Sequence, residues 1–279
     1  TLTFIALIVI WCYNLSEFYP VPFNPYHKRY RGDPFILSHW MKCILQKGCA
    51  YMDKHFQNIK NFFLKYKHGA IFSYFFIYMA WFTYLEKTVT TKFNPVYSRL
   101  DDLIPFNELF IIPYLLWFIY IFITVAYFFL TSKSDFYRCC AYLFIGMTIC
   151  LVIYTIWPNG HYLRVNLNTL GRSNLFIDLL AKIYHLDTAT NVFPSIHVFN
   201  SIGAFIAIHK SEKLKKVKWI QVSAFWLTVL ICMSTVFLKQ HSILDVFGGL
   251  ALSILMYLIV YVATWGKETK KVEQQLSNI

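Results

Sequence analysis

The chain contains 279 residues, of which 57% are hydrophobic and only 14% are charged. Soluble domains carry roughly 25% charged residues, so this composition excludes an ordinary soluble domain. The formal net charge of +12 does not indicate nucleic-acid binding, because the lysines and arginines cluster in short loops between apolar stretches, as in the cytoplasmic loops of membrane proteins. The composition predicts an all-α, polytopic membrane helical bundle with no nucleic-acid partner.

The first part of the chain, residues 1–67, differs in character from the rest. Thr1–Leu15 is apolar, and we interpret it as an extra N-terminal span. From Ser16 to His68, prolines and a basic run precede apolar residues at helical spacing, which predicts basic amphipathic helices at the membrane surface. A cytosolic region that contacts another protein is the alternative.

Residues 68–265 hold the remaining apolar stretches and are expected to form one membrane domain, because a helix crosses the bilayer core with roughly 20 apolar residues. The six expected spans are Ala70–Leu85, Phe106–Leu130, Cys139–Trp157, Ile196–Ile208, Val217–Phe237 and Ile243–Thr264. Thr131–Arg138 is expected as a polar loop, and Asn174–Tyr184 as a short helix lying on the membrane surface. Residues 266–279 are expected to form a cytoplasmic tail.

The distribution of lysines predicts which loops share a side of the membrane. His209–Lys216 and the tail are rich in lysine, and both are therefore expected in the cytoplasm. Alternation then puts Pro158–Asn191 and Phe237–Ser242 on the opposite face, which is extracytoplasmic or lumenal. The polar residues with chemical potential all lie near that face.

Two polar motifs stand at the edges of spans on that face. The first is Pro194-Ser195-Ile196-His197, in which the proline suits the first turn of a helix and the serine lies at a helix N-terminus that can bind an anion. In the second, His241 and Asp245 are four residues apart and so share one face of a helix. A carboxylate can orient an imidazole and raise its basicity. That imidazole can then act as a nucleophile while a second one protonates the leaving group.

With Ser234, these motifs resemble the second and third signatures of the type 2 phosphatidic acid phosphatase (PAP2) superfamily, which usually read P-S-G-H and S-R-x5-H-x3-D. The resemblance implies a six-helix membrane core and neither a metal nor another cofactor. It also implies that His241 takes the phosphoryl group, that Asp245 holds and activates it, and that His197 protonates the departing oxygen. Ser195 is implied as a phosphate ligand.

The chain departs from the superfamily pattern at its cations. Arg164 is the nearest match in the first signature, K-x6-R-P, but Val165 replaces the proline and Trp157 the lysine. Thr235 stands where the third signature has an arginine. The residues that can substitute as phosphate ligands are Arg172, Lys239 and His161.

The missing cations bear on the substrate, because a phosphodiester carries one negative charge and a monoester nearly two. Uncompensated positive charge is costly in a low-dielectric site, so fewer cations suit the diester. In this respect the chain is similar to the inositol phosphorylceramide synthase branch, whose members transfer a phospholipid head group to a ceramide. We therefore expect a metal-independent lipid phosphotransferase with a phospholipid donor and a lipid hydroxyl acceptor as partners. A phosphatase acting on phosphatidic acid-like or polyprenyl-phosphate monoesters is the alternative.

Other interpretations stay open. Transporters also keep ionisable residues in the membrane, although here these residues lie at span ends and not at the midplane. A catalytically inactive scaffold would account for the missing phosphate ligands, and the sequence is compatible with an oligomer or an accessory subunit. Asp101, Asp102 and Glu108 are expected as solvated loop carboxylates, with a place at the mouth of the site as the alternative. The pair Gly248-Gly249 is expected to permit close helix packing.

Overall fold

The structure, a computed structural model, describes residues 57, 60, 61 and 64–263. The chain divides into two compact units, Thr1–Tyr66 and Lys67–Ile279, and the second contains both sequence motifs. The predicted N-terminal span and the predicted tail at residues 266–279 lie outside the described residues, as does most of the predicted surface region up to His68.

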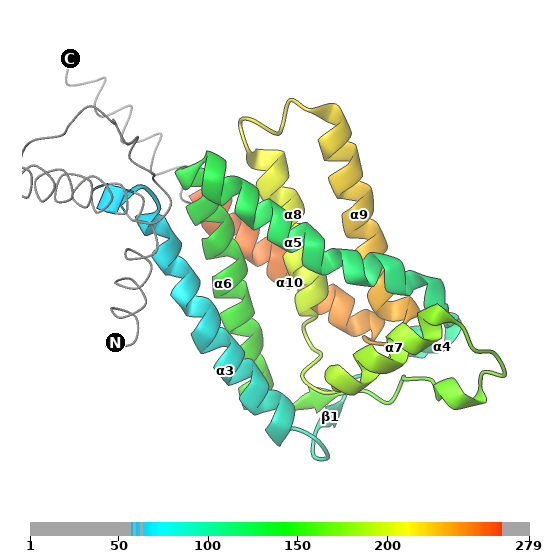
Figure 1. The fold of residues 1–279 in the computed structure, drawn as a ribbon. Helices are drawn as coiled ribbons and strands as arrows, with labels where there is room; N and C mark the ends of the chain where they lie inside the picture. The colour runs from blue at the N-terminus through cyan, green and yellow to red at the C-terminus, as the bar shows by residue number, and fades with distance from the viewer. Residues whose placement is uncertain (1–56, 58–59, 62–63, 264–279) are drawn as a thin grey trace, which may run out of the picture. The chain divides into compact units, whose positions relative to one another are not determined.

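The described part of the second unit is built mainly from helices (Figure 1). Its α-helices are α3 (Ser73–Thr88), α4 (Arg99–Leu103), α5 (Ile111–Thr131), α6 (Lys133–Ile156), α7 (Leu175–Leu186), α8 (Ile196–Lys210), α9 (Lys218–Phe237) and α10 (Ile243–Tyr257). Short 3₁₀ helices cover Lys67–Phe72, Glu108–Phe110 and Leu167–Thr169, and the π-helix Leu258–Ala263 continues α10. The two-residue strands β1 (Asn94–Pro95) and β2 (Asn159–Gly160) pair in parallel, with Asn94 opposite Asn159.

Among the described residues, four helical segments are long and apolar enough to cross a membrane: Glu108–Thr131, Lys133–Ile156, Lys218–Phe237 and Ile243–Ala263. They confirm the prediction of an integral membrane protein with several helical spans. The two other predicted spans correspond to α3 and α8, which contain 16 and 15 residues. These helices are shorter than the roughly 20 residues that a straight crossing requires.

The polar loop predicted at Thr131–Arg138 is wrong. α5 ends at Thr131 and α6 begins at Lys133, so Ser132 alone separates them. The Ser132 hydroxyl caps α6 by accepting a hydrogen bond from the Asp135 N–H at 3.3 Å. The charged residues that suggested a loop occupy the first turns of α6, where polar side chains can reach the membrane surface. The predicted short helix at Asn174–Tyr184 is confirmed as a helix, α7.

α8 lies at the centre of the helical bundle and packs against α5, α6, α9 and α10 (Figure 1). Small residues allow this close approach. A Cβ atom on Gly203 of α8 would lie 2.4 Å from the Tyr142 ring of α6, and one on Gly146 of α6 would lie 1.9 Å from the Phe199 ring of α8. Glycine and other small residues serve this purpose in membrane bundles, where neighbouring helices have no hydrophobic driving force to associate.

The connections between helices gather at two opposite ends of the bundle. At the end that carries β1, α4 and α7 in Figure 1, the Asn107 N–H donates to the Phe237 carbonyl at 3.1 Å, and Gly160 forms a β-bridge with Thr190. At the other end, the Ser211 hydroxyl donates to Asp135 at 3.0 Å. The end with α4 and α7 contains both polar motifs. Pro158–Asn191 and Phe237–Ser242 thus lie at one end of the bundle and His209–Lys216 at the other, as the alternation of spans predicts.

Candidate active site

A short turn between α9 and α10 carries His241. The N–H groups of Gln240 and His241 both donate to the Thr235 carbonyl, at 2.9 and 3.0 Å, which closes the end of α9. Lys239 adopts a left-handed backbone conformation with φ of 54°, which is uncommon for a residue with a side chain. Its ammonium donates to the carbonyls of Asp101 and Ile104, both at 2.6 Å. The Lys239 side chain therefore ties the turn to α4.

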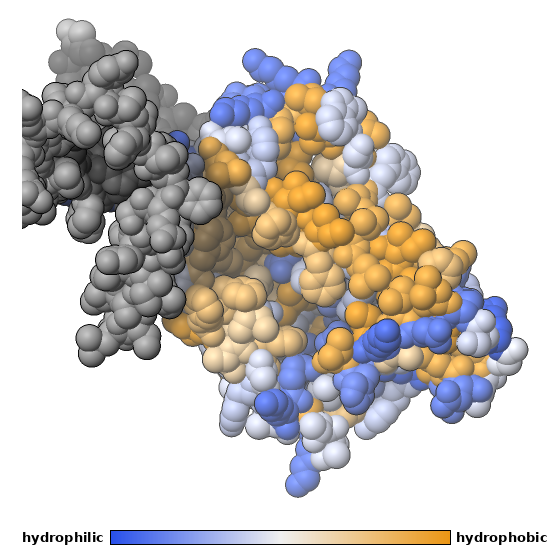
Figure 2. All heavy atoms as spheres, in the orientation of Figure 1, coloured by the Kyte–Doolittle hydropathy of each residue, from blue (hydrophilic) through white to orange (hydrophobic). Residues whose placement is uncertain are grey.

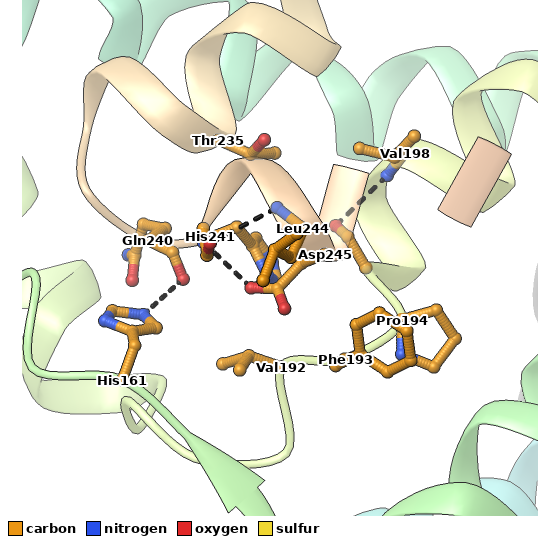
Figure 3. Close-up of polar contacts among 12 residues, drawn as sticks. His161, Val192, Phe193, Pro194, Val198, Thr235, Gln240, His241, Leu244 and Asp245 are labelled. Atoms are coloured by element: carbon orange, nitrogen blue, oxygen red, sulfur yellow. Dashed lines mark hydrogen bonds and ion pairs between the residues drawn. The ribbon is translucent and has the colours of Figure 1, made fainter. Parts of the chain in front are cut away.

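His241 and Asp245 contact each other as their spacing predicts (Figure 3). His241 Nδ1 lies 3.2 Å from Asp245 Oδ2, and the same oxygen accepts a hydrogen bond from the Ser242 N–H at 2.9 Å. With Asp245 ionised, Nδ1 carries the ring proton and the lone pair of Nε2 is free to react. Burial, together with the smaller effect of the positive charge of Arg164, lowers the pKa of His241 to about 3. The ring is therefore neutral near pH 7, as a nucleophile must be.

A carboxylate from a distant segment also holds this turn in place. Asp101 accepts hydrogen bonds from the Ser242 hydroxyl at 2.6 Å and from the Ile243 N–H at 2.7 Å. It is 2% exposed, so the expectation of a solvated loop carboxylate is wrong for Asp101. It is wrong for Glu108 as well, which is buried, and correct for Asp102, which is exposed. Asp101 also accepts from the Ser98 N–H at 2.8 Å in a helix cap. Its two partners in the turn that carries His241 lie far along the chain, and no local pattern in the sequence reveals them.

The two motifs meet where α8 and α10 begin. The Ser195 N–H donates to the Asp245 carbonyl at 3.1 Å, and the Ser195 hydroxyl caps α8 by accepting from the Val198 N–H at 3.4 Å. A Cβ atom on Gly249 would lie 3.0 Å from the Ser195 carbonyl, so the glycine pair permits close packing as predicted. Figure 3 shows the Pro194 segment beside Asp245. Two helix N-termini, each carrying a partial positive charge, therefore lie together.

The second histidine of the site is His197, in the first turn of α8. The centres of the His197 and His241 rings are 5.6 Å apart. His197 also packs against two aromatic rings of α5, those of Tyr114 at 4.8 Å and Trp117 at 4.4 Å. The structure thus brings together the three residues to which the resemblance assigns catalysis, His197, His241 and Asp245.

The predicted cationic phosphate ligands are all occupied by protein groups. Arg164 donates to the carbonyls of Tyr184, Asp187 and Thr188 and to Gln240 Oε1, at 2.6–2.9 Å. Arg172 is half-exposed and pairs with Glu108 at 2.6 Å. The Thr235 hydroxyl, at the usual arginine position, donates to the Cys232 carbonyl at 2.8 Å.

His161 lies next to the turn that carries His241. The Leu163 N–H donates to its Nδ1 at 3.1 Å, so Nε2 carries the proton and donates to the Gln240 carbonyl at 2.7 Å (Figure 3). Burial lowers the pKa of His161 to about 4. Arg164 and His161 thus both bind Gln240, a residue that the sequence did not single out. Because Arg164 holds the Gln240 amide oxygen, the amide Nε2 remains without a partner.

A cavity of about 820 Å³ reaches the two histidines. Aromatic and aliphatic side chains of α3, α5 and α6 form most of its wall, while His197, Asn200, Gln240 and His241 line its polar part. Among the described residues that line it there is neither a lysine nor an arginine. In Figure 2 the apolar band of this face is hollowed, and hydrophilic atoms are visible inside the hollow. A cavity with a long apolar wall and a small polar end suits a lipid.

Several buried polar atoms along this cavity have no hydrogen-bond partner among the described residues. They are Trp117 Nε1, Asn191 Oδ1, Asn200 Oδ1 and Gln240 Nε2. Buried polar groups in folded proteins are nearly always paired. A group of unpaired atoms around one cavity therefore indicates that a polar ligand completes them.

Comparison with known proteins supports the superfamily at the catalytic motifs. A model of the PAP2 superfamily matches residues 172–268. The match contains both polar motifs, and it begins after Arg164 and His161. No curated protein and no solved structure matches the chain. The superfamily generally comprises phosphatases and phosphotransferases, and the match suggests an activity of this class.

Proposed function

We propose that the chain is a lipid phosphotransferase that moves the head group of a phosphodiester lipid to a lipid hydroxyl through an adduct on His241. In the first step, His241 Nε2 forms a bond to phosphorus, and the bond from phosphorus to the lipid alcohol breaks. His197 enters this step as the imidazolium, gives its proton to the departing oxygen and becomes neutral. In the second step, the acceptor hydroxyl attacks phosphorus, His197 takes the hydroxyl proton, and the bond from phosphorus to His241 breaks.

The observation that carries this proposal is the kind of donor offered to the phosphoryl oxygens. The cavity presents neutral N–H donors, Gln240 Nε2 and Trp117 Nε1, beside the two histidines, whereas Arg164 binds protein carbonyls. The N-termini of α8 and α10 add only partial positive charge. Neutral donors and partial charges suit a phosphodiester with one negative charge better than a monoester with nearly two.

A phosphatase acting on phosphate monoesters is the second candidate, and the position of Arg164 favours it. Its guanidinium contacts the side chain of Gln240, which directly precedes His241 in the chain. If the Gln240 side chain moved aside, Arg164 could reach the phosphoryl group. Water would then be the acceptor in the second step, and inorganic phosphate would be released.

The test measures where a label in the lipid head group goes. Full-length protein in mixed micelles receives phosphatidylethanolamine or phosphatidylglycerol labelled in the head group, with and without ceramide. We expect a labelled protein adduct in the wild type, stable in alkali, and labelled ceramide as product. His241→Ala should form no adduct, and His197→Ala should lower the rate by at least about a hundredfold, the usual contribution of a general acid.

The matched control is His185→Ala, because His185 is an exposed histidine of α7. It should keep wild-type activity. Full activity in His241→Ala would contradict the mechanism. Release of inorganic phosphate from phosphatidic acid, without head-group transfer from either diester, would establish the phosphatase instead.

A further inference from the structure

The cavity carries two carboxylates as well as the histidines. Glu86, at the end of α3, and Asp187, after α7, both line it. Glu86 accepts hydrogen bonds from the Thr188 N–H at 3.1 Å and from Asn191 Nδ2 at 2.9 Å. Asp187 accepts one from the Tyr114 hydroxyl at 3.3 Å. In the described ranges, neither carboxylate has a lysine or arginine within ion-pair distance. Arg164 binds the Asp187 carbonyl and acts on both carboxylates from beyond that distance, so their negative charge is only partly compensated by the protein.

An unpartnered acceptor lies next to these carboxylates. Asn191 is 6% exposed and lines the cavity, and in the described part of the chain its Oδ1 has no hydrogen-bond partner. Because its Nδ2 donates to Glu86, the orientation of the amide is fixed with the oxygen as the free atom. A left-handed backbone with φ of 58° holds Asn191 at this position. A ligand that satisfies Asn191 Oδ1 must donate a hydrogen bond.

Aromatic rings complete this part of the cavity. Tyr78 and Tyr114 are both buried and both line it, and the Tyr114 hydroxyl binds Asp187. A cation near the face of an aromatic ring is attracted by the ring quadrupole, more strongly when it is shielded from water. The carboxylates, the unpaired acceptor and the aromatic rings all favour a ligand group that is positively charged and donates hydrogen bonds.

The polar groups of the cavity include both donors and acceptors. Two unpaired donors, Gln240 Nε2 and Trp117 Nε1, and one unpaired acceptor, Asn200 Oδ1, accompany the histidines, while the carboxylates and Asn191 Oδ1 offer acceptors alone. A phosphodiester head group with an ammonium complements both groups, because its phosphate accepts hydrogen bonds and its nitrogen donates them.

We propose that Glu86, Asp187 and Asn191 bind the primary ammonium of a zwitterionic phospholipid, so that the donor is a lipid with an ethanolamine-type head group. This inference rests on the proposed function for the location of the phosphate. A quaternary ammonium is disfavoured because it has no N–H for Asn191. An anionic head group such as glycerol phosphate gains nothing from the carboxylates and is repelled by them.

The test measures binding without chemistry. The full-length His241→Ala protein in detergent is titrated with phosphatidylethanolamine, phosphatidylcholine or phosphatidylglycerol of equal chain length, and bound lipid is counted by native mass spectrometry. We expect phosphatidylethanolamine to bind at least about tenfold more tightly than either other lipid, a difference of about 1.4 kcal/mol. Adding Glu86→Gln or Asp187→Asn should bring the three affinities within about threefold of one another.

The matched control is Glu212→Gln, because Glu212 is an exposed glutamate that pairs with Lys215 at the opposite end of the bundle. It should keep the preference. Two cavity variants are used so that misfolding of one leaves the other informative. Equal binding of all three lipids, or a preference for phosphatidylglycerol, overturns the inference. If phosphatidylcholine binds as tightly as phosphatidylethanolamine, the inference that the site selects a primary ammonium is wrong.

The binding result also separates this inference from the proposed function. A preference for phosphatidylethanolamine in His241→Ala, together with no turnover by the wild type, sustains the ammonium site and rejects the phosphotransferase. Turnover of phosphatidylethanolamine and phosphatidylglycerol by the wild type, without a binding preference in His241→Ala, sustains the phosphotransferase and rejects the ammonium site.

Discussion

At the scale of single residues, the two oxygens of Asp245 have different surroundings. Oδ2 contacts His241 Nδ1 and the Ser242 N–H, whereas Oδ1 is buried without a partner. Asp245 is thus a positioning residue that fixes the His241 ring. In Asp245→Asn, the amide can satisfy either the ring or the Ser242 N–H, but it no longer enforces the tautomer with a free Nε2 lone pair. We expect the rate of adduct formation to fall by about 10²–10⁴-fold, as for the corresponding change in a serine protease triad.

Two measurements on Asp245→Asn distinguish a loss of His241 orientation from a general disruption of the site. Binding of phosphatidylethanolamine should change by less than about threefold, while the single-turnover rate of adduct formation falls. The matched control is Asp102→Asn, because Asp102 is an exposed carboxylate bound only to the Tyr97 hydroxyl among the described contacts. Parallel losses of binding and rate would contradict a positioning role.

His161 should make stability depend on pH. Burial lowers its pKa from 6.5 to about 4, so below pH 6.5 the unfolded chain binds a proton that the folded chain excludes. Stability is therefore lost as pH falls from 6.5 to 4, by an amount on the order of 3 kcal/mol. Asp187 acts in the opposite direction between pH 6 and 4, because burial and the neighbouring Glu86 raise its pKa to about 6.

The His161 contribution is isolated with His161→Gln, which keeps an N–H donor for the Gln240 carbonyl and does not titrate. We expect thermal unfolding in detergent to show a smaller loss of Tm between pH 7 and pH 5 than in the wild type. His185→Gln, at an exposed position, should match the wild type. The same pH slope in all three proteins would show that His161 is not the source.

Residue patterns predicted the contacts of the candidate site because helical spacing and motif position fix them. His241 and Asp245 meet because residues four apart share a helix face. The contacts of the Lys239, Arg164 and Arg172 side chains could not be predicted from such patterns. Each has a long side chain whose partners, such as the Asp101 carbonyl and Glu108, come from remote segments. Gln240 and Asn191 were missed for the same reason, since only the fold brings them to the cavity.

At the scale of helices, the contact of α6 with α8 depends on glycine. A Cβ atom on Gly146 would lie 1.9 Å from Phe199 Cζ. The Phe199 ring cannot easily move away, because it is fully buried and stacked on Tyr142 with the ring centres 5.0 Å apart. Gly146→Ala should therefore destabilise the protein by about 1–3 kcal/mol, the usual cost of overpacking a core.

Thermal unfolding in detergent measures this effect. The matched control is Ile145→Ala, because Ile145 is the next residue of α6 and is 46% exposed. Lipid tails are as apolar as the side chain, so the control should unfold near the wild-type Tm. If Gly146→Ala also keeps the wild-type Tm, the close approach of α6 and α8 is wrong.

Element boundaries were less predictable than element types. Apolar runs long enough to span a bilayer gave the positions of α5, α6, α9 and α10. The junction of α5 and α6 was misplaced because hydropathy does not distinguish a polar loop from the polar first turns of a helix. The capping interaction between Ser132 and Asp135 is the local signal that could have corrected it, since a serine before an acidic residue in the first turn is typical of a helix start.

At the scale of the molecule, the two ends of the bundle differ in chemistry. One end holds the turn that carries His241 and most of the acidic side chains that the structure describes, including Asp101, Glu86 and Asp187. The other end holds the connection from α8 to α9, which contains the lysine-rich run His209–Lys216. Cytoplasmic loops carry the excess of positive charge. We therefore predict that the catalytic end faces away from the cytoplasm, where the substrate head groups lie in the outer or lumenal leaflet.

Cysteine labelling decides the orientation. Ser173→Cys places a thiol on the exposed segment before α7, and Glu212→Cys places one on the exposed lysine-rich connection. The wild type measures the background from the seven native cysteines, of which Cys139, Cys140 and Cys150 are buried, Cys232 is partly exposed, and Cys12, Cys43 and Cys49 lie outside the described residues. We expect a membrane-impermeant maleimide to label Ser173→Cys in intact cells, and to label Glu212→Cys only after the membrane is opened. The reverse pattern would place the histidines on the cytoplasmic side, and the donor lipid would then have to come from the cytoplasmic leaflet.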